Sequence, residues 1–276
     1  MENLKGILFM ILAMAGFAFE DLFIKMLSAY FPISEVIMIL GFTGSIVFLI
    51  IAIFQNAPII HKDLLDKYVI MRTICELLGA VFFVTAIALT PLSSASAILQ
   101  ITPLLVTIGA VIFFREKVGW RRWSAVFVGF MGVLLILRPG FGGFMPASIF
   151  ALLGSVFLAA RDLSTRAMKV DLPSVTIALY AFIAFGISGI LIIPFNSPMV
   201  IPSLNQIMYF IGASTFGVFA YYSLVISSRI GEMSVISPFR YSRIVFAMLL
   251  AIIILSLIHI SEPTRRRGMS YCGLGV

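Results

Sequence analysis

The sequence contains few charged residues, and this scarcity excludes a soluble globular fold. Only 11% of the 276 residues are charged and 61% are hydrophobic, whereas soluble domains carry about 25% charged residues. A single core of a chain this long is too small to bury so much apolar surface. The apolar residues form uncharged runs such as 36–54 and 95–114, and about 20 such residues cross a bilayer. We therefore expect an all-α membrane protein.

Cysteine, histidine and catalytic motifs are also scarce. Cys75 and Cys272 suggest no disulfide framework, and His61 and His259 are the two histidines. The sequence has no HExxH, GxSxG or Walker motif. A glycine-rich segment at 138–144 follows a predicted helix rather than a strand, which favours a linker over a phosphate-binding loop. These absences argue against an enzyme, a cofactor and a metal site.

Hydrophobic periodicity and run length predict nine membrane spans joined by short linkers. Eight spans follow the first, so we expect the first to be retained rather than cleaved as a signal peptide. The predicted spans are 5–27, 34–54, 68–89, 93–114, 122–137, 146–168, 174–195, 205–227 and 232–256.

The basic residues fall mainly on one side of these spans. Only Lys25 and Arg138 fall on the other side. Positively charged loops stay in the cytoplasm, so the N-terminus is predicted to be cytoplasmic in a bacterial inner membrane. The bilayer, and not nucleic acid, is the expected partner of this basic chain. The residues on the cytoplasmic side are Lys5, Lys62, Lys67, Arg72, Arg115, Lys117, Arg121, Arg122, Arg166, Lys169 and Arg229.

The two halves of the chain resemble each other. Phe-Glu-Asp-Leu at 19–22 corresponds to Ala-Arg-Asp-Leu at 160–163, and Ile-Thr-Pro103 corresponds to Ile-Ser-Pro238. A repeat of five helices is odd-numbered, so the second copy must insert upside down. Inverted repeats with proline-interrupted helices are typical of secondary carriers. We expect repeats at 1–138 and 146–254, a linker at 139–145, and ten helices of which nine are visible.

The segment 255–276 does not continue the second repeat. Residues 255–265 read LSLIHISEPTR, which resembles the in-frame translation of a sequencing adapter. We expect 255–276 to be a non-native tail that stands where a tenth helix belongs. The alternative is a genuine basic cytoplasmic tail.

One stretch carries a resemblance to a known family. Residues 86–104 read AIALTPLSSASAILQITPL, with FFRE at 113–116 and a glycine-containing helix from Gly129 onward. This pattern resembles EamA-type permeases of the drug/metabolite transporter superfamily, and the resemblance extends over 4–254. It implies ten helices, cytoplasmic termini and transport of metabolites or drugs. The family's second glutamate and tenth helix are missing after Phe239.

Charged residues inside spans are the strongest candidates for a site, because each costs about 2.5–3.5 kcal/mol near a helix centre. Arg240 and Arg243 share one helix face after Pro238, and they suit a carboxylate or phosphate group. The structural alternative is an ion pair with Glu76. Glu76 itself is a candidate proton carrier, because a carboxyl group removed from water favours its protonated form. It also lies four residues from Arg72, at ion-pair spacing.

Further candidates concern gating and the cavity lining. Asp21 and Asp162 are equivalent in the repeats and are expected at opposite mouths, where pairs with Lys25 and Arg166 could lock two gates. The alternative for these pairs is anchoring at the membrane interface. Pro103 and Pro238 are predicted helix breaks. Polar lining is expected from Gln100, Tyr221 and Tyr241, although membrane aromatics more often serve packing.

These features predict a secondary transporter that moves a small metabolite or drug by alternating access. Its substrate is expected between spans 1, 3 and 4 and spans 6, 8 and 9. A non-catalytic membrane subunit or a small-molecule-sensing module is the alternative. Beside the substrate and the bilayer, a coupled proton and a second copy of the chain are candidate partners.

Overall fold

The fold is all-α, as the sequence predicts. The computed structural model describes residues 2–90, 92–137, 146–169, 172–195, 198–230 and 232–250, and these residues form helices and no strand. A helical stretch over 242–250 ends the described chain. The elements are α1 Glu2–Leu27, α2 Ile33–Phe54, η1 Lys62–Leu65, α3 Lys67–Leu89, α4 Leu92–Leu99, α5 Thr102–Phe114, α6 Trp120–Leu137, α7 Ser148–Ala167, α8 Ser174–Ile192, η2 Ile193–Phe195, α9 Leu204–Ile230, α10 Met233–Ile236 and η3 Ser237–Tyr241.

The long helices reproduce the predicted spans to within a few residues. Six of the described helices, α1, α2, α3, α7, α8 and α9, are long and apolar enough to cross a membrane. The predicted span 93–114 is divided into α4 and α5, and the predicted span 232–256 is divided into α10, η3 and the stretch 242–250. The linker 139–145 and the tail 255–276 lie outside the described residues.

Apolar side chains cover the outside and charged ones lie inside, which is the reverse of a soluble protein. On α2, Ile46 and Ile53 are 58% and 60% exposed. Arg72, Glu76 and Asp162 are buried. Charged side chains in membrane helices face the bundle interior, where other groups can pair with them. The chain is therefore a multi-pass membrane protein.

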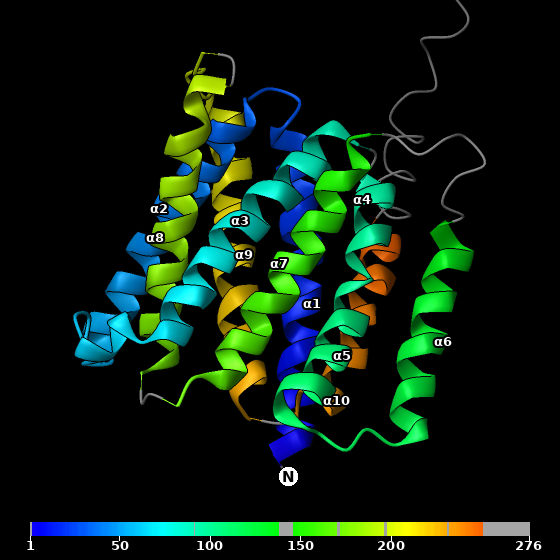
Figure 1. Cartoon of the computed structure of the whole chain (residues 1–276). Helices are drawn as coiled ribbons and strands as arrows, with labels where there is room; N and C mark the ends of the chain where they lie inside the picture. Colours follow the sequence, from blue (N-terminus) through cyan, green and yellow to red (C-terminus); the bar gives the residue numbers. More distant parts are fainter. Residues whose placement is uncertain are drawn as a thin grey trace, which may run out of the picture.

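Helices from the first half of the chain pack along helices from the second half. The extensive pairs are α1 with α9, α2 with α8 and α3 with α7 (Figure 1). Small residues permit the close approach. At Gly41 of α2, an added β-carbon would collide with the backbone of Gly186 on α8. The interior of the bundle is thus shared by the two halves.

We predict that Gly41→Ala lowers the stability of the bundle by about 1–3 kcal/mol, the usual cost of overpacking. The backbone of Gly186 cannot rotate away as a side chain could, so α2 and α8 must separate. Thermal unfolding of the purified protein in detergent measures the effect. The control is Gly119→Ala, because an added β-carbon at Gly119 meets no atom within 4 Å. Equal midpoints for the two variants would contradict the packing argument.

Candidate functional site

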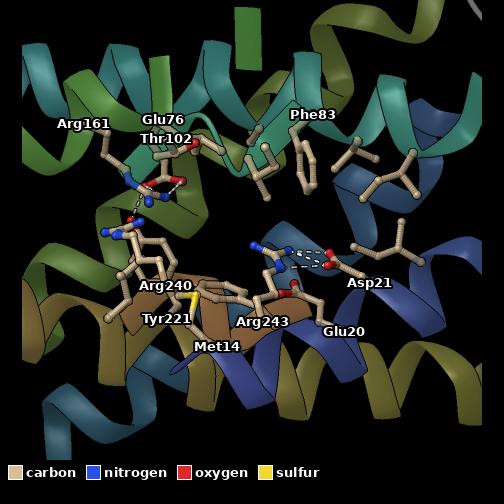
Figure 2. A pocket seen from close by; sticks show the side chains of 18 of the residues that line it. Met14, Glu20, Asp21, Glu76, Phe83, Thr102, Arg161, Tyr221, Arg240 and Arg243 are labelled. Carbon is tan, nitrogen blue, oxygen red and sulfur yellow. Dashed lines mark hydrogen bonds and ion pairs between the residues drawn. The ribbon is translucent and has the colours of Figure 1, made fainter. Parts of the chain in front are cut away.

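A cavity opens between the two halves of the chain. Its empty space is about 930 Å³, counting the part that opens to the outside. Along α3 it reaches from Glu76 to Ile87, a rise of about 16 Å. Phe83, Phe182 and Phe185 belong to its apolar wall. The polar side chains that line it are Glu20, Asp21, Glu76, Gln100, Thr102, Arg161, Tyr221, Arg240 and Arg243 (Figure 2).

Glu76 of α3 is the centre of a first group of buried charges. Arg161 of α7 donates from Nη1 to the Glu76 carboxylate oxygens at 3.1 and 3.4 Å. The hydroxyl of Tyr221 on α9 donates to Glu76 Oε2. Arg72 lies one turn before Glu76, 3.9 Å away, and donates to the Tyr221 hydroxyl at 2.5 Å and to Thr165 at 3.1 Å. Three helices are joined around one carboxylate.

Asp162 extends this group toward η3. Its Oδ1 accepts from Arg161 Nε at 2.9 Å. Its Oδ2 lies 2.5 Å from Arg240 Nη2, an ion pair without hydrogen-bond alignment, since both atoms lack a hydrogen-bond partner in the described part of the chain. We refer to Arg72, Glu76, Arg161, Asp162, Tyr221 and Arg240 as the Glu76 cluster.

A second group of charges joins α1 to the helical stretch after η3. Arg243 binds Asp21 through two nitrogens, with Nε 2.9 Å from Oδ2 and Nη2 2.6 Å from Oδ1. Its guanidinium lies 5.0 Å from the ring centre of Phe17, within cation–π range. Glu20 lies beside this pair (Figure 2). We refer to Glu20, Asp21 and Arg243 as the Asp21 cluster.

Glu20 occupies space that a glycine leaves open. A β-carbon at Gly217 of α9 would collide with the Glu20 carboxylate. The carboxylate lines the cavity, and no described residue forms a hydrogen bond or an ion pair with it. It is therefore available to a molecule in the cavity.

The two predicted helix breaks meet next to the cavity. Pro103 lies at the start of α5 and Pro238 at the start of η3. The carbonyl of Pro103 accepts from the hydroxyls of Ser237 and Thr107, both at 2.8 Å. The Thr107 bond stays within α5, one turn from Pro103, whereas the Ser237 bond crosses from η3 to α5. The broken helices are thereby tied together, and η3 holds Arg240 in the interior.

The cavity brings together most of the residues predicted as its lining. Glu76, Gln100, Tyr221, Arg240 and Arg243 all line it, as do Asp21 and Pro103. Tyr241 does not line it and instead packs with Ile244 and Phe130. Asp162 lies behind the lining and holds Arg161 and Arg240. The roles of these residues in binding and gating stay predictions.

The structure does not form the two possible pairs within single helices, nor the alternative pair of Arg240 with Glu76. Asp21 binds Arg243 and not Lys25, whose ammonium donates to the carbonyls of Ile87 and Thr90 at 2.9 and 3.2 Å. Arg166 donates to the carbonyl of Arg229 and not to Asp162. Arg240 is paired with Asp162 and not with Glu76. Spacing along one helix could not reveal these partners, because they come from other helices.

Several lining residues were not among the predicted site residues. Glu20 and Arg161 each adjoin a predicted aspartate, and that adjacency was the available signal in the sequence. Phe182 and Phe185 come from α8, which has no charged residue to draw attention to it. Among the described residues, no three His, Cys, Asp or Glu side chains are grouped as metal ligands.

The chain is similar to known membrane transporters. Residues 4–138 match the EamA-like transporter family. The riboflavin transporter of Vibrio cholerae is 27% identical over 183 residues, covering 63% of this chain and 59% of the relative. The S-adenosylmethionine uptake transporter of Rickettsia prowazekii is 22% identical over 256 residues, covering 90% of this chain and 83% of the relative. A solved crystal structure shares the fold, with a TM-score of 0.75, 18% identity, and coverage of 95% and 90% of the two chains.

Proposed function

We propose that the chain, whose residues 4–138 match the EamA-like transporter family, carries a small metabolite across a bacterial inner membrane by alternating access. The observation that carries this proposal is the charged cavity between the two halves. In secondary carriers, substrate sites lie between repeats and beside broken helices, and Pro103, Arg240 and Arg243 bring such a break to the cavity wall. The relatives named above are transporters of small molecules.

Two ion pairs are suited to act as the gates. Asp162 of α7 holds Arg240, and Asp21 of α1 holds Arg243. Both arginines follow the same helix break and lie three residues apart, so one segment is tied to both halves. We propose that each transport half-cycle releases one of these ties. We also propose that residues 1–138 and 146–254 are inverted repeats.

Uptake into proteoliposomes tests the proposed function. The purified full chain is reconstituted and offered labelled riboflavin, S-adenosylmethionine and a panel of amino acids, with and without an imposed pH gradient. We expect at least one compound to accumulate above protein-free liposomes, and a dependence on the gradient would support proton coupling. Binding of these compounds without accumulation would instead favour a sensing module. Accumulation equal to protein-free liposomes for the whole panel would contradict the transporter proposal.

We also propose that the N-terminus is cytoplasmic. The linker 115–119 lies at the same end of the bundle as the N-terminus, and Lys117 belongs to this basic end (Figure 1). A green fluorescent protein fused after Lys117 should fluoresce, because it folds in the cytoplasm. Alkaline phosphatase fused after Pro202 should be active, because it requires export. Exchanging the two reporters is the control, and the opposite result at both positions would reverse the orientation.

A further inference from the structure

The Glu76 cluster carries one positive charge more than its acids balance. Its guanidiniums are those of Arg72, Arg161 and Arg240, and its carboxylates are those of Glu76 and Asp162. Arg161 lies between both carboxylates, and Arg72 is one turn from Glu76. The surplus charge therefore falls on Arg240, whose single ionic contact among the described residues is a carboxylate already shared with Arg161.

Two buried polar groups at this end of the cavity lack a partner. Arg240 is 7% exposed, and its Nε has no hydrogen bond to any described residue. Thr102 is 3% exposed, and its hydroxyl is likewise unpaired there. Both side chains line the cavity. An unpaired polar group in a membrane interior is costly, and the anionic group of a ligand is suited to pair with both.

The Asp21 cluster has the opposite imbalance. Arg243 is held by Asp21 at 2.6 Å, which leaves the second carboxylate, that of Glu20, uncompensated. The nearest lysine along α1, Lys25, is engaged by backbone carbonyls. Glu20 therefore offers a carboxyl group to the cavity without a partner among the described residues, and a cationic group bound beside it would favour the ionised form of that carboxyl.

From this pattern, and resting on the proposed function, we infer that the cavity binds a zwitterion: its acidic group lies at Arg240 and Thr102, and its cationic group lies at Glu20. Figure 2 shows Arg161, Glu76 and Arg240 on one side of the cavity and Arg243, Glu20 and Asp21 to their right. The wall also has apolar residues, among them Phe83 beside Arg243 and Phe182 beside Tyr221. One bound zwitterion supplies the missing charge at both ends, whereas a singly charged molecule leaves one end unpaired in a low-dielectric interior.

Matched ligands test this inference with the purified full chain. L-phenylalanine is compared with phenethylamine, which lacks the carboxylate, and with 3-phenylpropionate, which lacks the ammonium. S-adenosylmethionine is compared with its decarboxylated form, and riboflavin serves as a compound that lacks both charges. The ligand concentration that half-saturates the shift in unfolding temperature measures binding. L-phenylalanine and S-adenosylmethionine both carry a zwitterionic α-amino acid group. We expect at least one of them to bind, and its analogues that lack the carboxylate or the ammonium of that group to bind at least about tenfold more weakly.

Two variants test which residue binds each charged group of the ligand. Glu20→Gln should weaken binding of the zwitterion and leave 3-phenylpropionate unchanged, because that ligand has no cation for Glu20. Arg240→Gln should weaken binding of the zwitterion and leave phenethylamine unchanged. Failure of both zwitterions to bind, or equal binding of the zwitterion and its analogues, would overturn the inference.

The inference and the proposed function can fail separately. Riboflavin accumulation in proteoliposomes without zwitterion binding would remove the inference and leave a transporter. Zwitterion binding without accumulation of any compound would keep the binding site and remove the transport function.

Discussion

Glu76→Gln is expected to destabilise the protein by about 3–5 kcal/mol, the usual cost of removing one partner from a buried ion pair. The variant leaves the three guanidiniums of Arg72, Arg161 and Arg240 facing the single carboxylate of Asp162. Glutamine keeps the shape of the side chain, so the loss comes from charge and not from a cavity. Unfolding of the purified protein by denaturing detergent measures the change.

A second buried glutamate provides the control for Glu76→Gln. Glu35 on α2 is 4% exposed, and its carboxylate accepts from the backbone nitrogen of Val200 at 2.9 Å. No arginine of the described chain pairs with it, and a glutamine oxygen can accept the same bond. Glu35→Gln should therefore cost much less.

Restoring the charge balance should restore stability. The double variant Arg72→Gln with Glu76→Gln removes one charge of each sign from the cluster. It is expected to be more stable than Glu76→Gln alone, because the coupling between close charges makes the two effects non-additive. Additive losses in the double variant would show that the Glu76 cluster is not held together by charge.

Arg240→Gln is expected to abolish uptake of the transported compound and to leave folding close to that of the parent. The variant leaves two guanidiniums and two carboxylates in the Glu76 cluster, and Asp162 keeps its 2.9 Å bond to Arg161. No buried carboxylate is stranded, so the unfolding free energy should change by less than about 1 kcal/mol. Proteoliposome uptake and detergent unfolding, measured on the same preparation, give the two readouts.

An arginine outside the cavity serves as the comparison for Arg240→Gln. Arg121 is exposed at the start of α6, and Arg121→Gln should retain both uptake and stability. If Arg240→Gln transports normally, Arg240 does not belong to the site. If the Arg240→Gln variant unfolds as readily as Glu76→Gln, Arg240 has a structural role, namely to neutralise the buried carboxylate of Asp162.

Local features of the chain were readable from the sequence. Long uncharged runs predicted the spans, because the apolar residues that a membrane helix needs all lie within its own segment of the sequence. Pro103 and Pro238 predicted interruptions, and the structure does break both spans there. The cost of buried charge singled out Glu76, Arg240 and Arg243, and all three line the cavity.

Partners across helices were not readable in the same way. Asp21 is four residues from Lys25, a spacing that permits a pair on one helix, yet Arg243 from the far end of the chain holds it. The bidentate geometry of an arginine and a carboxylate is a stronger interaction than a single ammonium contact. Lys25, close to the end of α1, reaches the carbonyls of Ile87 and Thr90 instead.

The sequence by itself determined that the chain crosses a membrane several times as helices, which charges must be kept from lipid, and where two helices break. These properties depend on hydrophobicity and backbone chemistry within one segment. Only the tertiary structure decided that Arg161 lies between Glu76 and Asp162 and that Glu20 lies beside Arg243 without a described partner of its own. It also decided that α8 supplies aromatic residues to the cavity wall. Which charge remains unpaired depends on how α1, α3, α7 and the residues after Pro238 meet, and no periodicity within a single helix encodes that meeting.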